Sequence, residues 1–210
     1  MPATAKICGL STAPTLDAAI AGGASHVGFN FFAPSPRYVT PERARALAQR
    51  MPAHVRRVGV YVDPDDALLD ATAATLDAIQ LHKTPVERIA AIRARLGRET
   101  WGVVAVKTRA DLDGVARLAG AADRILYDAK TPDGAKLPGG MGVRFDWSLL
   151  DAFRHPLPWA LSGGLDAGNV GEAIARTRAP IVDVSSGVES APGIKDVDRI
   201  ATFLQRVAAS

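Results

Sequence analysis

Short apolar runs alternate with longer amphipathic stretches along the whole chain. Eight such runs, several of them rich in valine and isoleucine, have the length and composition of strands that are buried on both faces of a sheet. They predict strands over residues 6–8, 26–29, 57–62, 78–81, 101–106, 124–127, 159–161 and 181–184.

The stretches between these runs carry signals for the start of a helix. Thr40 followed by Pro41 is typical of an N-cap and a first helical position, and Asp63 followed by Pro64 repeats the pattern. Helices are therefore expected to begin directly after Thr40 and directly after Asp63.

Two further helices are predicted near the end of the chain. Asp166 is expected to cap a helix over 167–176, and a last helix is expected over 196–207. Glycines that follow apolar helical stretches are expected to end helices in the left-handed conformation, namely Gly22-Gly23, Gly97 and Gly120. One face of the last helix is apolar, with Ile200, Phe203, Leu204 and Val207.

Eight strand–helix repeats in 210 residues average about 26 residues each, which suits a compact (β/α)8 (TIM) barrel of the α/β class. We expect a single domain over 1–210, because no linker or shift in composition divides the chain. An open doubly wound sheet is the alternative. It needs a glycine-rich fingerprint after the first strand, where the sequence reads Cys8-Gly9-Leu10-Ser11 instead.

Composition narrows the classes of function. Hydrophobic residues make up 48% of the chain and charged residues 22%, as in ordinary globular proteins. No apolar stretch is long enough for a membrane span, and no secretory leader is visible. The single cysteine fits a reducing, cytoplasmic setting. The four histidines and the cysteine lack metal-ligand spacing, so no metal site is expected.

Net charge is +3, which raises nucleic-acid binding as a possibility. Basic residues are dispersed, however, and the longest basic run is Arg56-Arg57, whereas nucleic-acid binding favours a cluster. The sequence therefore indicates a small-molecule ligand, and the basic excess suits an anionic one.

In a barrel of this kind the active site is built from the loops that follow the strands. The seventh and eighth of these loops are small and contain glycine, and together they predict a phosphate site that uses backbone N–H groups. The alternative is that both are merely tight turns. The candidate ligands are Gly163, Gly164, Ser185, Ser186 and Gly187.

Cys8 ends the first predicted strand and Asp128 follows the sixth. As a pair across the barrel mouth they could act as base and acid, provided that nearby positive charge lowers the pKa of the thiol. Lys6 lies two residues before Cys8, on the same side of the strand, and could supply that charge or pair with a carboxylate. Alternatively, Cys8 is a small buried hydrophobe and Asp128 a helix cap.

Arg37 lies in a proline-rich loop after the second strand and could bind a substrate carboxylate, although an ordinary surface role is also open. The long stretch 130–145 is rich in glycine, as lids and binding loops often are. Gln80 and His82 are weaker candidates, and Asp183, inside the last strand, is expected to be structural rather than catalytic.

Read together, these segments resemble the phosphoribosylanthranilate isomerases of tryptophan biosynthesis over nearly the whole chain. The segments that carry the resemblance are Lys6-Ile7-Cys8-Gly9, Val27-Gly28-Phe29, Ser35-Pro36-Arg37-Tyr38, Val58-Gly59-Val60, Ile79-Gln80-Leu81-His82, Tyr127-Asp128, Gly139-Gly140, Phe145-Asp146-Trp147, Leu161-Ser162-Gly163-Gly164-Leu165, Asn169-Val170, Asp183-Val184-Ser185-Ser186-Gly187-Val188-Glu189, Pro192-Gly193 and Lys195-Asp196.

The resemblance implies a barrel fold and a cofactor-free Amadori rearrangement of N-(5-phosphoribosyl)anthranilate to 1-(2-carboxyphenylamino)-1-deoxyribulose 5-phosphate. It implies that Cys8 is the general base, that Asp128 is the general acid and that Arg37 contacts the anthranilate carboxylate. The glycine and serine residues of the seventh and eighth loops would hold the phosphate. This chemistry calls for a raised pKa at Asp128 and a lowered pKa at Cys8.

One position departs from the family pattern, because Met141 stands where a hydroxyl residue is common. Family members occur as monomers or dimers, so a monomer or homodimer is expected. Another phosphosugar-isomerase barrel, or a barrel that binds a phosphorylated ligand without catalysis, is the alternative function. The first would place an aspartate at the position of Cys8, and the second would not need the Cys8 and Asp128 pair.

Overall fold

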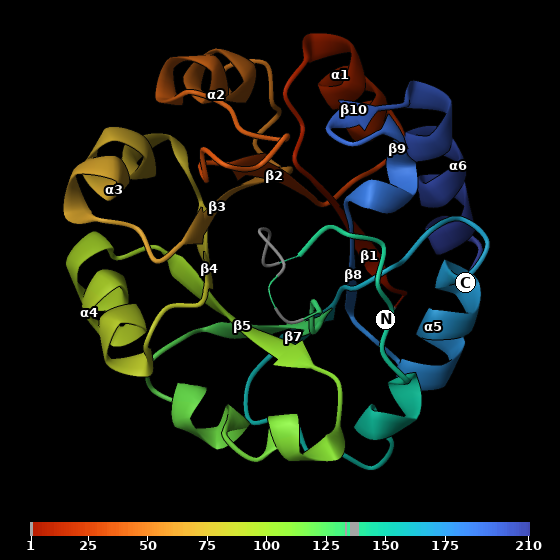
Figure 1. Cartoon of the computed structure of the whole chain (residues 1–210). Helices are drawn as coiled ribbons and strands as arrows, with labels where there is room; N and C mark the ends of the chain where they lie inside the picture. Colours follow the sequence, from red (N-terminus) through yellow and green to blue (C-terminus); the bar gives the residue numbers. More distant parts are fainter. Residues whose placement is uncertain (1, 133, 135–138) are drawn as a thin grey trace.

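The computed structural model describes residues 2–132, 134 and 139–210. Its strands close into one parallel barrel, in which each strand pairs with the next and β8 returns to β1 (Figure 1). All eight predicted strands are confirmed, with ends shifted by at most two residues. They are β1 (Thr4–Cys8), β2 (His26–Asn30), β3 (Arg56–Val62), β4 (Ala78–His82), β5 (Glu99–Val106), β6 (Arg124–Ala129), β7 (Trp159–Leu161) and β8 (Ile181–Val184).

A ring of helices surrounds the barrel (Figure 1). The α-helices are α1 (Ala13–Ala21), α2 (Pro41–Ala48), α3 (Asp66–Thr72), α4 (Val86–Leu96), α5 (Val170–Thr177) and α6 (Val197–Ala208). Short 3-10 helices cover Ala73–Thr75 and Ser186–Val188, and the hairpin of β9 (Glu189–Ala191) and β10 (Ile194–Lys195) follows β8. None of the helices in the described part of the chain has the length and hydropathy needed to cross a bilayer.

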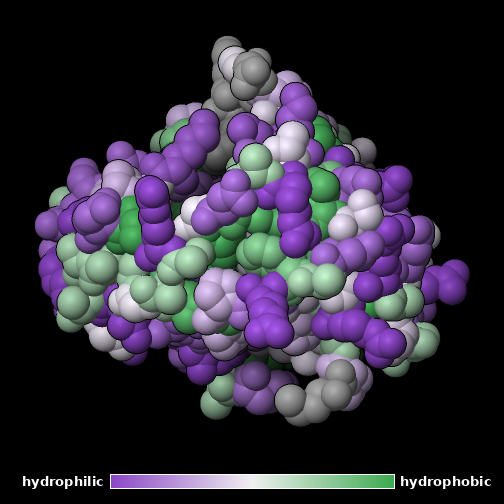
Figure 2. Space-filling view, turned by 90° about the horizontal axis from the view of Figure 1, so that it is seen from below, coloured by the Kyte–Doolittle hydropathy of each residue, from purple (hydrophilic) through white to green (hydrophobic). Residues whose placement is uncertain are grey.

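The fifth and sixth connections differ from the expected pattern of one α-helix after each strand. Single 3-10 turns stand there, over Arg109–Leu112, Val115–Leu118 and Trp147–Leu150. Gly114 separates the first two, as expected of a residue that disfavours a continuous helix. Figure 2 shows this side of the barrel, where hydrophilic side chains border a hydrophobic patch.

Two predicted helix starts are wrong. Asp63 has φ +40° and lies outside the helix, and Asp65 is the N-cap of α3, since its carboxylate accepts from the N–H of Leu68 at 2.8 Å. Asp166 accepts instead from the N–H groups of Gly168 and Asn169, at 2.7 and 3.1 Å. This closes a separate turn, so α5 begins only after Asn169.

The remaining helix predictions hold with two exceptions, at Gly22 and at Gly120, which follows a 3-10 turn that already ends at Leu118. Thr40 caps α2 by accepting from the N–H of Arg43, and the predicted apolar face of α6 is buried. Gly97 ends α4 with φ +58°, and Gly120 has φ +89°. At the end of α1 the left-handed residue is Gly23, whereas Gly22 keeps a right-handed φ of −78°.

Alternation along the strands separates two cores. Outward-facing residues of the strands pack against the helices in one large cluster. Inward-facing residues form a small layer inside the barrel, made by Val58, Ala78, Trp101, Leu126, Ala160 and Ile181. Two residues further along four of the eight strands, the inward positions become polar, with Gln80 after Ala78, Asp128 after Leu126, Ser162 after Ala160 and Asp183 after Ile181. Polar side chains therefore lie at the carboxyl ends of the strands, next to the apolar layer inside the barrel.

Candidate active site

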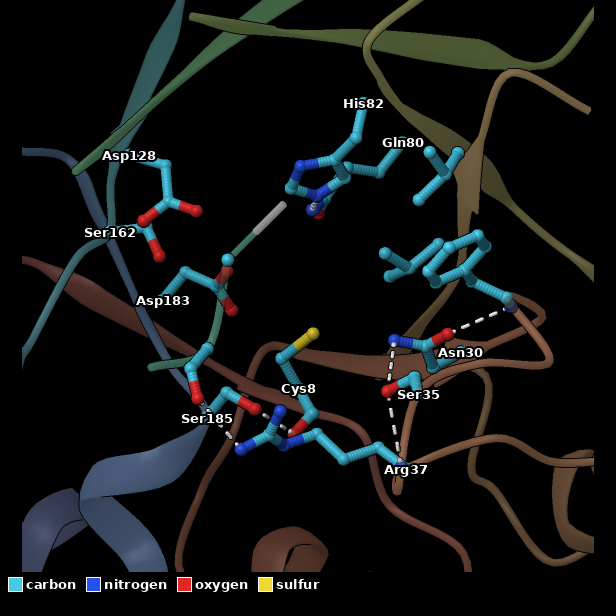
Figure 3. A pocket seen from close by; sticks show the side chains of 15 residues that line it. Cys8, Asn30, Ser35, Arg37, Gln80, His82, Asp128, Ser162, Asp183 and Ser185 are labelled. Atoms are coloured by element: carbon cyan, nitrogen blue, oxygen red, sulfur yellow. Dashed lines mark hydrogen bonds between the residues drawn. The ribbon is translucent and has the colours of Figure 1, made fainter. Parts of the chain in front are cut away.

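A cavity opens at the carboxyl ends of the strands, and three separately predicted residues meet there. Cys8, Arg37 and Asp128 line it together with Ser185, Gln80, His82 and Asp183 (Figure 3). A neighbouring cavity shares Asp128 and Ser185 and continues along the seventh and eighth loops. All the predicted site residues except Gly187 thus line the groove that these two neighbouring cavities form.

Cys8 ends β1 and is 8% exposed. Gly28 of β2 leaves the space that the thiol occupies, because a Cβ at that position would lie 2.9 Å from Sγ of Cys8 and 3.3 Å from Nζ of Lys6. The expected lowering of the thiol pKa is wrong for this structure. Burial raises the pKa of Cys8, and the nearby Lys6 and Lys195 only partly offset that effect.

Lys6 lies on the Cys8 side of β1, as predicted, and its ammonium donates to Asp183 of β8 at 2.9 Å. Both side chains are almost fully buried. Burial alone would lower the pKa of Lys6, but the charges of Asp183 and Cys8 outweigh it and raise the pKa. A charged ammonium therefore lies near the thiol and favours its deprotonated form. Asp183 pairs with Lys6 and also lines the cavity, so its predicted structural role stays a prediction.

Asp128 lies on β6 and is 6% exposed. Burial, reinforced by the charge of Asp183, raises the pKa of its carboxyl to about 7. Its Oδ1 accepts from the N–H of Ala129 at 2.9 Å. Gly139 approaches the other oxygen so closely that a Cβ there would lie 2.6 Å from Oδ2. The direction of this shift agrees with the raised pKa that the family resemblance implies for Asp128.

Gln80 and His82 form a pair on the β4 wall of the cavity (Figure 3). Their Nε2 atoms are 2.9 Å apart. Burial and the charge of Lys6 lower the pKa of His82 to about 3, so the ring is neutral and its Nε2 accepts from the Gln80 amide. Within the described residues, Oε1 of Gln80 is buried and has no hydrogen-bond partner. It offers an acceptor to a ligand hydroxyl.

Arg37 is 5% exposed, so it is not a surface side chain. Its Nε and Nη2 donate to the carboxylate of Glu189 at 2.7 Å each, and Lys195 donates to the same carboxylate at 2.7 Å. Neither Glu189 nor Lys195 is assigned a role by sequence analysis, although both lie in segments that resemble the family. Both residues lie at least 152 positions from Arg37 along the chain, so the sequence alone did not indicate the contact.

The seventh and eighth loops lie beside each other around the second cavity. Gly163 and Gly164 have φ +91° and +61°, and a Cβ on either would lie within 3 Å of neighbouring backbone atoms. Within the described residues, the N–H groups of Gly164 and Ser186 donate to no protein acceptor. Backbone N–H groups that have no protein acceptor and no neighbouring side chain in the way can donate to a bound anion. Gly187 lines the adjoining rim rather than this cavity.

Ser185 is engaged within the protein. Its hydroxyl donates to the carbonyl of Cys8 at 3.3 Å and accepts from Lys195 at 3.2 Å. The predicted lid region contributes Gly139 to Gly142 to the two cavities, and residues 133 and 135–138 lie outside the described part of the chain. In the described ranges, no group of three histidine, cysteine or acidic side chains is placed to hold a metal ion.

A closed (β/α)8 barrel thus carries a buried thiol and a buried carboxyl around one cavity, next to glycine-rich seventh and eighth loops. The chain belongs to the N-(5'-phosphoribosyl)anthranilate isomerase family, whose sequence pattern matches residues 5–206.

Individual proteins that are similar to this chain carry the same family name. The N-(5'-phosphoribosyl)anthranilate isomerase of Zymomonas mobilis subsp. mobilis is 53% identical over 99% of both chains, and that of Paramagnetospirillum magneticum is 51% identical over 98% and 97%. The crystal structure of the Thermotoga maritima enzyme superposes with a TM-score of 0.86 at 38% identity, covering 99% of this chain and all of that one. A related enzyme in complex with reduced 1-(o-carboxyphenylamino)-1-deoxyribulose 5-phosphate gives a TM-score of 0.83 at 35% identity, with coverage of 99% and 100%.

Proposed function

We propose that this chain isomerises N-(5'-phosphoribosyl)anthranilate by an Amadori rearrangement, with Asp128 as general acid and Cys8 as general base. Membership of the family supports the reaction. The observation that carries the residue roles is the meeting of a buried carboxyl with a raised pKa and a buried thiol around one cavity.

Asp128 starts the reaction. Its protonated carboxyl donates to the ring oxygen of the ribose, the bond from that oxygen to C1' breaks, and the nitrogen lone pair completes a Schiff base. A carboxyl with its ordinary pKa would be almost fully ionised near neutral pH and could not donate. The pKa of about 7 keeps a useful fraction protonated.

Cys8 completes it. As thiolate it takes the proton from C2', and the electron pair of that bond moves into the Schiff base to form an enolamine. The enolamine then tautomerises to the ketone, as C1' gains a proton from solvent and the 2'-hydroxyl loses its own. Because burial raises the pKa of the thiol, the productive state, with Cys8 ionised and Asp128 protonated, is a minor arrangement of the shared proton. The ammonium of Lys6 favours that arrangement.

The rest of the groove holds the substrate. Arg37 binds the anthranilate carboxylate, and the backbone of Gly163, Gly164, Ser186 and Gly187 binds the phosphate, with Ser185 shaping the eighth loop. The unpartnered Oε1 of Gln80 accepts from a hydroxyl of the sugar.

The experiment is to mix the purified protein with freshly generated substrate in D2O, follow the loss of substrate fluorescence and examine the product by mass spectrometry. We expect rapid loss and one non-exchangeable deuterium at C1', because solvent-derived protons are added there. No loss with a folded protein would refute the function, and a product without deuterium at C1' would refute the proton-transfer route.

A further inference from the structure

Arg37 is held by a second buried charge. Its Nε and Nη2 donate to the two oxygens of Glu189 at 2.7 Å each, and both side chains are at most 6% exposed. Such a bidentate pair is neutral overall. By itself it would give a second carboxylate little electrostatic attraction, because Glu189 repels what Arg37 attracts.

Lys195 changes this balance. Its ammonium donates to Oε1 of Glu189 at 2.7 Å, to the carbonyl of Ser185 at 2.8 Å and to the hydroxyl of Ser185 at 3.2 Å. Three acceptors around one nitrogen match the three N–H donors of a charged ammonium. The side chain is 1% exposed, so water does not screen it. Burial lowers the pKa of Lys195, and the adjacent carboxylate of Glu189 opposes that effect. With Lys195 as an ammonium, Arg37, Glu189 and Lys195 carry a net charge of +1 beside the cavity that Arg37 lines.

The contacts also leave one end of the guanidinium for a ligand. Nη2 of Arg37 donates to the carbonyl of Gly140 at 2.9 Å, and the N–H of Gly193 donates to Oε2 of Glu189 at 3.2 Å, which fixes both partners. In the described part of the chain, Nη1 of Arg37 has no hydrogen-bond partner. A fixed cation with one open amino group is suited to a carboxylate at a single defined position.

We propose that Lys195 is a specificity-determining positioning residue: by offsetting the charge of Glu189, it allows Arg37 to select a substrate whose aromatic ring carries a carboxylate. The inference deepens the proposed function and rests on it, since it concerns the site that Arg37 forms. Lys195 acts through Glu189 and Arg37 and needs no contact with the substrate.

The test compares two substrates that differ only in that carboxylate, the phosphoribosyl adducts of anthranilate and of aniline. The measured quantity is the ratio of kcat/KM for the first to kcat/KM for the second. Lys195→Gln keeps an N–H donor for Ser185 but removes the charge, and Lys195→Arg is the matched control that keeps it. We expect Lys195→Gln to lower the ratio about tenfold, through KM of the anthranilate substrate, and Lys195→Arg to retain most of it.

An unchanged ratio in folded Lys195→Gln would overturn the inference, because a purely structural lysine does not distinguish the two substrates. If that variant does not fold, the double variant Glu189→Gln/Lys195→Gln replaces it. There Arg37 alone supplies +1, so the ratio should stay within about threefold of wild type, and its collapse would refute the charge argument. An inactive wild type would instead refute the proposed function, which keeps the two failures apart.

Discussion

The raised pKa of Asp128 has a consequence for stability that can be measured without substrate. A carboxyl whose pKa is higher in the folded than in the unfolded state holds its proton more tightly when folded. Its contribution to stability is therefore fully present below the unfolded pKa and is lost as pH rises through the folded value. Replacing Asp128 by asparagine, which cannot ionise, removes that loss. Asp128→Asn should thus gain stability relative to wild type as pH rises.

The size follows from the two pKa values. With 3.8 as the ordinary value and about 7 in the folded protein, and about 1.36 kcal/mol per pKa unit, the loss is roughly 4 kcal/mol above pH 7 and roughly 1.6 kcal/mol at pH 5. The advantage of Asp128→Asn should therefore grow by about 2–3 kcal/mol from pH 5 to pH 8 and then level off. Effects of the substitution on packing do not depend on pH and cancel in this difference.

Urea unfolding of both proteins between pH 5 and pH 9, followed by the fluorescence of the buried tryptophans, gives the comparison. A stability difference that stays constant across this range would show that Asp128 ionises at an ordinary pKa. That result would remove the physical basis for its role as an acid.

Three other predictions concern activity. Arg37→Ala should raise KM for the anthranilate substrate about 10- to 100-fold with a smaller effect on kcat, and unchanged constants would show that Arg37 does not contact the substrate. Gly28→Ala should lower kcat about 10²-fold because the added Cβ displaces Sγ of Cys8. Product-analogue affinity should remain, and a wild-type kcat would mean that the thiol position is not critical. The kcat/KM profile should rise through about pH 7, where the form with both groups protonated is lost, and fall above the raised pKa of Cys8. A profile that is already flat below pH 6 would contradict this assignment.

The strands could be predicted from the sequence because their burial is nearly continuous and their ends coincide with polar loops. The strand ends in turn placed Cys8, Asp128 and Arg37 at one end of the barrel. The 3-10 turns that follow β5 and β6 could not be predicted from the sequence. Whether a stretch such as the one around Gly114 forms 3-10 or α-helical turns depends on how it packs.

The errors at the site share a physical cause. The pKa of Cys8 depends on burial by the whole barrel mouth, which outweighs the lysine that the sequence places next to it. The contact between Arg37 and Glu189 joins the second and eighth loops, and only closure of the barrel brings those loops together. The raised pKa of Asp128 could be anticipated only because the chemistry of the resembling family requires it.

The most direct test of the account compares kcat of the wild type with that of Cys8→Ala and Asp128→Asn on freshly generated N-(5'-phosphoribosyl)anthranilate, with thermal unfolding to confirm that each variant folds. Positioned acids and bases typically contribute about 10²- to 10⁴-fold, so we expect kcat of each variant to fall by at least about 10²-fold. A folded variant whose kcat stays within about tenfold of wild type would contradict the role of the group it lacks.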